Sequence, residues 1–245
     1  MKILKFSLIV LILAGAISCK KPTLATLNIS KADAATILAG STASNTYGIY
    51  SINSDISLNA QLQAAVTNSG CGITVTDTII RHSTTGSSAS YNYNLYYNHK
   101  LFCNTANAPD NISGTLTYNG NYNNPSLTLT NSGTTTYTIA GFTQTASVYS
   151  LNGEYKSTGT FKLKNDTTNT GTVNIDMILK NLTTSKSTMY LTGGSATVII
   201  TGSTTKKGDF TYNGVLTINT GSLATLVLNG TTYQVNLVLG TITPK

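Results

Sequence analysis

The chain has 245 residues, of which 40% are hydrophobic and only 9% are charged. Thr, Asn and Ser occupy 44, 25 and 24 positions, whereas average soluble domains carry about 25% charged residues. Helical surfaces are usually rich in Glu, Lys, Arg and Ala, while Thr and Tyr favour pleated strands. This composition excludes a largely helical protein, and the length allows one domain of roughly 200 residues or two small ones.

The N-terminal residues have the pattern of a secretory signal. Two lysines precede an apolar run over residues 6–17, which ends in Ala16-Ile17-Ser18-Cys19. This run is shorter than the roughly 20 residues that a transmembrane helix needs, so it predicts a cleaved signal peptide. Its end resembles a bacterial lipobox, with Ala16 where Leu is usual, and predicts acylation of Cys19. The alternative is an ordinary signal peptide followed by an incidental cysteine.

We therefore expect three parts along the chain: a lipoprotein signal peptide (1–18), a lipidated tether (19–29) and a single β-rich domain with an N-terminal helical appendage (30–245). Lipid chains on Cys19 would anchor the protein firmly, because each buried CH₂ group contributes ~0.8 kcal/mol. The expected location is the cell envelope, as an outer-membrane lipoprotein whose membrane partner is reached through this lipid.

Basic residues are in excess but scattered. Removal of residues 1–18 leaves 13 basic and 8 acidic side chains, and Arg81 is the only arginine. Proteins that bind nucleic acid cluster Lys and Arg on one face and favour Arg for bidentate contacts. We therefore expect no nucleic-acid partner.

Two short helices are expected before the strands. Ser30 followed by Asp33 has the pattern of a capping box, and the helix that it begins is expected to stop at Gly40. Residues 55–67 suit a second helix as well as a strand. Both segments are too short to be stable alone, so they should pack on the sheet.

A disulfide-linked hairpin follows. Residues 72–83 and 90–102 each alternate with period two, and a turn cluster separates them. A hairpin centred on Ser87 places Cys71 opposite Cys103, at a separation that suits a disulfide. In an exported protein, two cysteines are most simply a disulfide; a pair of free thiols is the alternative.

The same register separates the two histidines. His82 would lie opposite Asn92, seven residues from His99 and about 23 Å away at the rise of a strand. We therefore expect no metal site that contains both, and we predict no metal and no cofactor. An all-oxygen Ca²⁺ site built from Asp and carbonyl groups stays open as an alternative.

Short strands with turn signals continue to the C-terminus. Asn-Gly pairs occur at residues 119–120, 152–153, 213–214 and 229–230, and Gly193-Gly194 suggests a bulge or a strand break. The last pair predicts a type I′ hairpin turn. The fold class is therefore all-β: a single antiparallel β-meander that forms a sandwich or a (half-)barrel, with one or two short N-terminal helices.

Several segments resemble uncharacterised lipoproteins of Bacteroidota. They are residues 16–21, Cys71-Gly72, 102–104, 151–155, and 202–203 before 208–212. The resemblance implies no activity and no site. Surface-exported lipoproteins of that phylum often have acidic residues after the cysteine; residues 20–23 have none, which favours the periplasmic leaflet. Asp77-Thr78-Ile79 and Asp166-Thr167-Thr168 resemble the O-glycosylation acceptor triplet of the phylum.

The sequence offers little catalytic chemistry. Glu154 is the only glutamate, and it follows an Asn-Gly pair where a solvated acid at a strand end is expected. A glycosidase would pair it with Asp166 or Asp176 across a cleft. No Gly-x-Ser-x-Gly elbow or phosphate-binding loop is present. We predict no catalytic residues and no enzyme; a hydrolase that depends on Glu154 or His99 is the alternative to be tested.

One cluster of aromatic and amide side chains suggests a binding patch. Odd-numbered tyrosines from 91 to 97 should line the core, whereas Tyr96 has the opposite parity and lies among Asn92, Asn94 and Asn98. Aromatic faces combined with amides suit a sugar or peptide ligand.

Two classes of function follow. The first is an envelope lipoprotein with a structural or binding role, and a protein or glycan partner. The second is a carrier of a lipid or another small apolar ligand inside a barrel-like cavity.

Overall fold

The structure is a computed structural model that describes residues 28–44, 47–65, 70–87, 89–166, 168–220 and 222–245. The expected signal peptide, Cys19 and most of the expected tether lie outside these residues. Two helices precede all of the strands: α1 (Lys31–Thr42) and α2 (Ile49–Ala65).

Eleven antiparallel strands form one sheet in which each strand pairs with its neighbours in the sequence. The strands are β1 (Thr74–His82), β2 (Ser90–Cys103), β3 (Pro109–Asn123), β4 (Leu127–Ala140), β5 (Val148–Leu163), β6 (Thr170–Ser185), β7 (Leu191–Thr204), β8 (Gly208–Ile218), β9 (Leu223–Leu228), β10 (Thr231–Asn236) and β11 (Thr241–Pro244).

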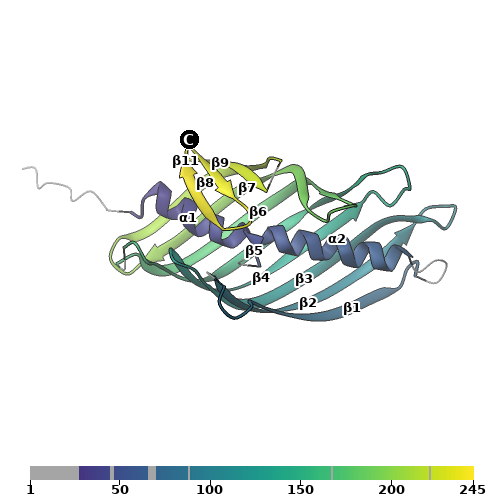
Figure 1. Cartoon of the computed structure of the whole chain (residues 1–245), viewed down its shortest axis with the longest axis horizontal. Coiled ribbons are helices and arrows are strands. Elements are labelled where there is room, and N and C mark those ends of the chain that lie inside the picture. The colour runs from purple at the N-terminus through teal and green to yellow at the C-terminus, as the bar shows by residue number, and fades with distance from the viewer. Residues whose placement is uncertain (1–27, 45–46, 66–69, 88, 167, 221) are drawn as a thin grey trace, which may run out of the picture.

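The sheet curves into an open trough, and both helices lie along its concave side (Figure 1). The short strands β9–β11 lie beside α1 at one end of the trough. The predicted all-β meander with two short N-terminal helices is confirmed. Because the strands form one curved sheet that does not close, the shape is that of a half-barrel.

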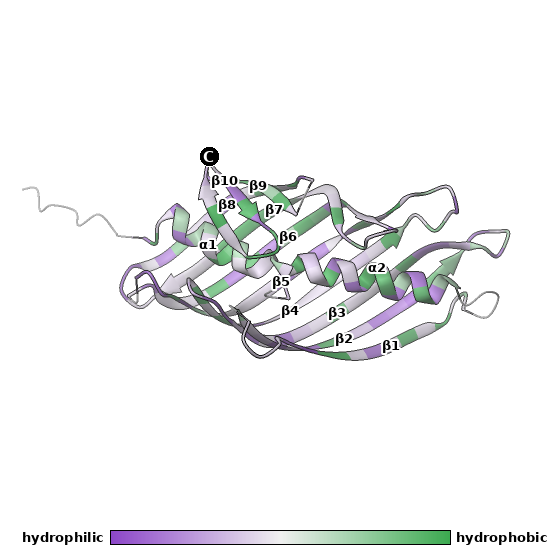
Figure 2. Ribbon diagram, viewed as in Figure 1, coloured by the Kyte–Doolittle hydropathy of each residue, from purple (hydrophilic) through white to green (hydrophobic). Residues whose placement is uncertain are grey.

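The core lies between the concave face and the helices. Each long strand alternates between buried apolar residues and exposed polar ones, and Figure 2 shows the same alternation in hydropathy along the ribbons. The fully buried side chains include the aromatic residues Tyr93, Tyr97, Tyr122, Tyr155 and Phe161. Burying such large side chains removes much apolar surface from water, which is the main favourable term in folding.

The predicted capping box begins α1. The Ser30 hydroxyl accepts a hydrogen bond from the Asp33 amide at 3.0 Å, and the Asp33 carboxylate accepts one from the Ser30 amide. The prediction that Gly40 ends this helix is wrong, because α1 continues to Thr42. Gly40 is buried against Leu127 of β4, where a Cβ atom would collide with the leucine side chain. Close packing explains this glycine.

The described part of the ambiguous segment, residues 55–65, is helical. Helix α2 begins at Ile49, six residues before the expected start, and buries Ile52, Asn53, Ile56 and Ser57 against the sheet. The chain reaches α2 after Ala43, at which α1 is capped in an extended conformation. Neither helix of the described chain is long and apolar enough to span a membrane.

The predicted register of the first hairpin is confirmed. Val75 lies opposite His99, Ile79 opposite Leu95 and His82 opposite Asn92. The disulfide between Cys71 and Cys103 is formed, with Cα atoms 5.7 Å apart. The bond therefore ties the open end of the β1–β2 hairpin, as the sequence predicts.

Three of the four Asn-Gly pairs do not form turns. Residues 119–120, 152–153 and 213–214 lie inside β3, β5 and β8, and the strands β2–β7 are 14 to 16 residues long. The expectation that Glu154 follows a turn is therefore wrong, since it lies within β5. At residues 229–230 the predicted two-residue turn is present, and both residues have positive φ angles of 43° and 79°.

Glycines on the concave face make room for aromatic rings. Gly120 lies opposite Tyr93, Gly133 opposite Tyr118, and Gly202 opposite Phe210. A Cβ atom at any of these glycines would collide with the ring across from it. These glycines therefore serve the packing of the core and do not break the strands.

The predicted irregularity at Gly193-Gly194 is a bulge. The pairing of β6 with β7 shifts between Lys180 and Thr184, and both Asn181 and Gly194 have positive φ angles. The strand β7 continues through the shift, so the bulge bends the ladder without ending it.

Candidate functional site

The four residues of the predicted patch lie on the outer, convex face of β2. Along this strand the odd-numbered side chains from Tyr93 to Leu101 are buried, whereas Asn92, Asn94, Tyr96 and Asn98 are exposed. The ring of Tyr96 is 46% exposed. The predicted division of the tyrosines between the core and the surface is therefore confirmed.

The register of the sheet extends this patch across the neighbouring strands. Side chains directly opposite one another on one face have Cβ atoms about 4.5–5.5 Å apart. The outward ladders that begin at Asn92, Asn94, Tyr96 and Asn98 continue through Asn121, Asn119, Thr117 and Thr115 of β3, and then through Thr130, Ser132, Thr134 and Thr136 of β4. The patch is thus one margin of a wide surface of hydroxyl and amide groups.

A hollow of about 720 Å³ lies in the middle of this surface. We call it the outer groove. It is lined by side chains of β3–β7, chiefly Thr117, Asn119, Ser132, Thr134, Lys156, Thr158, Asn174, Asp176, Ile199 and Thr201. A second hollow of about 530 Å³ shares Asn119, Ser132 and Thr158 with it and extends toward Asn121 and Thr160. Tyr96 and Asn94 lie opposite the lining residues Thr117 and Asn119 at its edge.

Few charges lie in the outer groove or beside it. The ammonium of Lys156 forms an ion pair with Glu154, with Nζ 2.7 Å from Oε1. Donation of this hydrogen bond raises the pKa of Lys156 above its ordinary value. Lys156 also lies opposite Asp176, whose Oδ1 atom is buried and accepts no hydrogen bond from the described residues. The groove therefore offers mainly neutral polar groups to a ligand.

An aliphatic patch adjoins the groove. Ile199 is 48% exposed and belongs to its lining, and Ile178, Val215 and Val227 are similarly exposed on β6, β8 and β9. Thr197 lies between Ile178 and Val215 in one ladder across the sheet. The outer face thus combines hydrogen-bonding groups over β2–β5 with apolar side chains over β6–β9.

The predicted carrier cavity would lie on the other face. Helices α1 and α2 lie over the concave side (Figure 1), and their side chains join the strand residues in one buried cluster. The side chain of Asn53 on α2 donates a hydrogen bond to the Thr184 hydroxyl on β6. Both hollows described above are lined chiefly by residues of the convex face, together with a few residues of the core parity such as Tyr118, Ile175 and Asn131.

Polar groups in the core are linked to one another. The Tyr93 hydroxyl donates to Asn131 at 2.8 Å, and Asn131 donates to Ser157 at 3.1 Å. The Tyr118 hydroxyl donates to the Tyr155 hydroxyl at 2.7 Å. Burial raises the pKa of both of these phenols, so they stay neutral and act as hydrogen-bonding groups.

An ion pair fastens α2 to the edge strand β1. Arg81 Nη2 lies 3.3 Å from Asp55 Oδ2, and Arg81 Nε donates to the Tyr47 hydroxyl at 3.0 Å. Burial raises the pKa of Asp55, although the Arg81 charge acts in the opposite direction. The two effects are of opposite sign, and the cost of burial is the larger.

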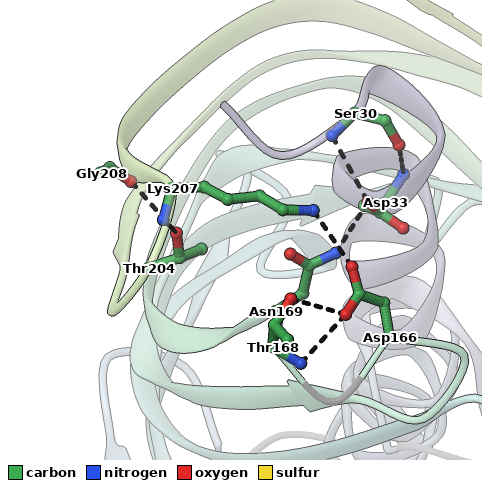
Figure 3. Close-up of polar contacts among 8 residues, drawn as sticks. All are labelled: Ser30, Asp33, Asp166, Thr168, Asn169, Thr204, Lys207 and Gly208. Carbon is green, nitrogen blue, oxygen red and sulfur yellow. Dashed lines mark hydrogen bonds and ion pairs between the residues drawn. The ribbon is translucent and has the colours of Figure 1, made fainter. Parts of the chain in front are cut away.

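A second polar cluster holds the beginning of α1 (Figure 3). Asn169 Nδ2 donates to Asp33 at 3.0 Å, and Lys207 Nζ lies 3.1 Å from Asp166 Oδ2. Hydrogen bonds from the hydroxyl of Thr168 and from Lys207 lower the pKa of Asp166 to about 2. This cluster fixes the point at which the expected tether joins the folded body.

The other residues considered from the sequence are dispersed. Glu154 and Asp176 both lie on the outer face, whereas Asp166 belongs to the cluster at α1. His99 is buried, and burial lowers its pKa. Among the described residues there is no group of three or more His, Cys, Asp or Glu side chains that could hold a metal ion. Thr78 is exposed on β1, while Thr167 lies outside the described residues.

Sequence reasoning identified one margin of the outer groove and missed the rest. The signal was present in β4, where all outward positions from Thr128 to Thr138 are Thr or Ser. A comparison of the chain with protein-family models, with curated proteins and with solved structures finds no match.

Proposed function

We propose that this chain is a membrane-anchored envelope lipoprotein whose outer face binds a neutral oligosaccharide, without catalysing a reaction. The observation that carries the binding role is the outer groove, which continues the patch of Tyr96 and its asparagine neighbours. The anchor is proposed from the sequence alone, on Cys19 and the apolar run before it.

The chemistry of the groove suits a sugar better than a charged ligand. Pyranose rings carry hydroxyl groups at their edges and C–H groups on their faces. Asn119, Ser132 and Thr134 supply partners for hydroxyl groups, while Tyr96 and Ile199 supply apolar surface. Since Lys156 is paired with Glu154, the groove has no unpaired cation among the described residues with which to select an anion, and the Asp176 carboxylate is the one charge that remains in its described lining.

Binding can be tested with an array of neutral oligosaccharides, followed by titration calorimetry on each sugar that binds. Ser132→Phe should fill the groove and abolish binding, and Tyr96→Ala should weaken binding about tenfold, or 1.4 kcal/mol. Thr217→Phe is the matched control, since Thr217 is exposed on the outer face of β8 outside the groove. Absence of binding across the array, or equal binding by Ser132→Phe, would refute the proposal.

The same sugars test the absence of catalysis. Chromatography of each bound oligosaccharide after long incubation should return it intact. Cleavage by the unaltered protein that is lost in Glu154→Gln would show that the protein is a hydrolase and would refute the proposed absence of catalysis.

The anchor needs a separate test. Metabolic labelling with a palmitate analogue should tag the unaltered chain, and Cys19→Ala should remove both the tag and the protein from the membrane fraction. A Cys19→Ala variant that stays in the membrane fraction would contradict the proposed lipid anchor.

The lipid carrier is the competing function. It would need the concave side to open, because α1 and α2 cover it. Mass spectrometry of an organic extract of the purified protein should detect no bound lipid, because chains attached covalently to Cys19 stay with the protein. A free lipid present in equal amount to the protein would favour the carrier instead.

A further inference from the structure

The strand β1 forms one margin of the sheet. It pairs with β2 along its whole length, and in the part of the chain that the structure describes no strand pairs with its other side. Figure 1 shows β1 at the outer boundary of the trough. The backbone groups on this side are therefore open to another strand.

The backbone hydrogen bonds between β1 and β2 identify the residues of β1 whose own N–H and C=O groups point away from β2. The Ser83 amide donates to the carbonyl of Tyr91 at 3.0 Å, in the same register as the rest of the hairpin. In an antiparallel pair, alternate residues bond to the partner strand. Ile79 and the other odd-numbered residues thus bond to β2, whereas Thr76, Thr78, Ile80 and His82 direct their N–H and C=O groups away from it.

This edge lacks some of the protection that edge strands usually carry, although the charges of Asp77 and Arg81 oppose pairing with any strand that does not neutralise them. Proline, lysine and bulges normally prevent an edge from pairing with another chain, and β1 contains no proline, no lysine and no register shift. Its Ile80 side chain is 64% exposed. The charged side chains of β1 are Asp77 and Arg81, which share the concave-side parity of Ile79.

We propose that the edge of β1 is the interface with a second copy of this chain, paired antiparallel about a two-fold axis at Ile79. This register places Asp77 opposite Arg81 of the partner subunit, and Arg81 opposite the partner's Asp77. The outward-directed backbone groups of Thr78 then meet those of the partner's Ile80. An isologous pair of this kind is the commonest symmetric assembly.

Charge complementarity selects this register from its neighbours. If the axis moved to Thr78, Asp77 would face Ile79 of the partner subunit. If it moved to Ile80, Arg81 would face Ile79 of the partner subunit. Only the axis at Ile79 pairs both charges, and it places them at non-hydrogen-bonded positions, where opposing side chains are closest.

The two charged residues are available for this contact. Arg81 uses Nε and Nη2 in its bonds to Tyr47 and Asp55, its side chain is 41% exposed, and its Nη1 atom has no hydrogen-bond partner among the described residues. Asp77 is exposed on β1, and in an extended strand it lies four residues, or about 13 Å, from Arg81 of its own chain. Asp77 therefore gains an opposite charge from the second copy, while Arg81, which is already paired with Asp55, gains a second one.

Sedimentation equilibrium of the full chain in detergent tests the proposal. We expect a reversible dimer at micromolar concentration. Thr78→Pro removes an amide that points to the edge and leaves the bonds to β2 intact, and Asp77→Lys places like charges opposite each other. Each should raise the dimer Kd at least tenfold, whereas Asp209→Lys, a charge reversal at an exposed position on β8, should leave it unchanged.

Crosslinking tests the register independently. Ile79→Cys should be joined to its equivalent in the partner by a short bismaleimide, whereas Thr74→Cys on the same strand should not, because the two copies of residue 74 would be far apart. A monomer at all concentrations, a dimer insensitive to both edge variants, or equal crosslinking at positions 74 and 79 would overturn the proposal. These outcomes do not depend on sugar binding by the outer groove.

Discussion

The hydroxyl groups of Tyr118 and Tyr155 meet 2.7 Å apart in the core, although their strands, β3 and β5, are not neighbours. The strand between them is β4, and it presents Gly133 at the crossing point. The two rings are stacked with centroids 5.8 Å apart. A residue without a side chain thus allows two aromatic side chains to bridge three strands.

Substitution of this glycine should therefore disturb the core. In Gly133→Ala the new Cβ atom would collide with the Tyr118 ring and with the Lys156 carbonyl. We expect a loss of about 1–3 kcal/mol, as is usual for overpacking. Urea unfolding followed by circular dichroism measures this loss, with Ser132→Ala on the outer face as the control, expected within about 0.5 kcal/mol of the unaltered protein.

The hydroxyl groups of Tyr155 and Tyr118 should contribute unequally to the free energy of unfolding. The Tyr155 hydroxyl accepts from Tyr118 and lies 3.4 Å from the Ser41 carbonyl on α1, to which it donates. Tyr155→Phe deprives Tyr118 of its acceptor and α1 of a donor, at a cost of about 1–3 kcal/mol. Tyr118→Phe should cost less, because Tyr155 keeps its bond to Ser41. Equal losses of unfolding free energy in the two variants would contradict this assignment.

The disulfide should account for a large part of the stability. It joins residues separated by 32 positions, and closing a loop of that length contributes about 3–4 kcal/mol in the chain-entropy model. The double variant Cys71→Ala, Cys103→Ala should lose this amount in urea unfolding. Treatment of the unaltered protein with a reductant should give a similar loss, and a change below about 1 kcal/mol in both would show that the hairpin is held by other contacts.

The ion pair at the start of α1 predicts a dependence on pH. The folded protein holds the pKa of Asp166 at about 2, below the ordinary value of 3.8. The unfolded chain therefore binds the proton more readily, so this contribution to stability is complete above about pH 4 and is lost as the pH falls toward 2. Asp166→Asn should be less stable than the unaltered protein at pH 7, and the difference should shrink toward zero near pH 2.

Lys207→Ala is the matched control for that experiment. It removes the Lys207 ammonium but keeps the hydrogen bonds from Thr168 to Asp166. The stability difference between Lys207→Ala and the unaltered protein should therefore change less between pH 7 and pH 2 than the difference for Asp166→Asn. A difference between Asp166→Asn and the unaltered protein that stays constant from pH 7 to pH 2 would refute the link to Asp166.

Short sequence patterns correctly predicted the features that depend on neighbouring residues alone. The capping box of Ser30 and Asp33, the Asn229-Gly230 turn and the pairing of Cys71 with Cys103 are all decided within a few residues or one hairpin. Each has a direct physical signature: a side-chain cap, a positive φ angle, or alternation with period two.

The errors share one cause, which is packing between distant segments. The sequence around Gly40 suggests the end of a helix, and the sequence around Gly120 suggests a turn. Both glycines nevertheless lie within regular structure. The Leu127 side chain occupies the space that a side chain at residue 40 would need, and the Tyr93 ring does the same at residue 120. The outer groove is similar, since its lining comes from five strands whose alignment includes a bulge between Leu151 and Gly153. Such an alignment cannot be read from any one strand.

The first helix of the folded body is fastened to the last strands of the chain. Lys31 on α1 donates to the Asn229 carbonyl at 2.9 Å, and the Ser44 amide donates to the Leu237 carbonyl at 2.7 Å. The ribosome synthesises the chain from the N-terminus to the C-terminus. The residues on which α1 packs are therefore made last, and α1 cannot reach its final position until almost the entire chain has been synthesised. A truncation before Leu223 would remove β9, β10 and β11 and so leave α1 without the strands on which it packs.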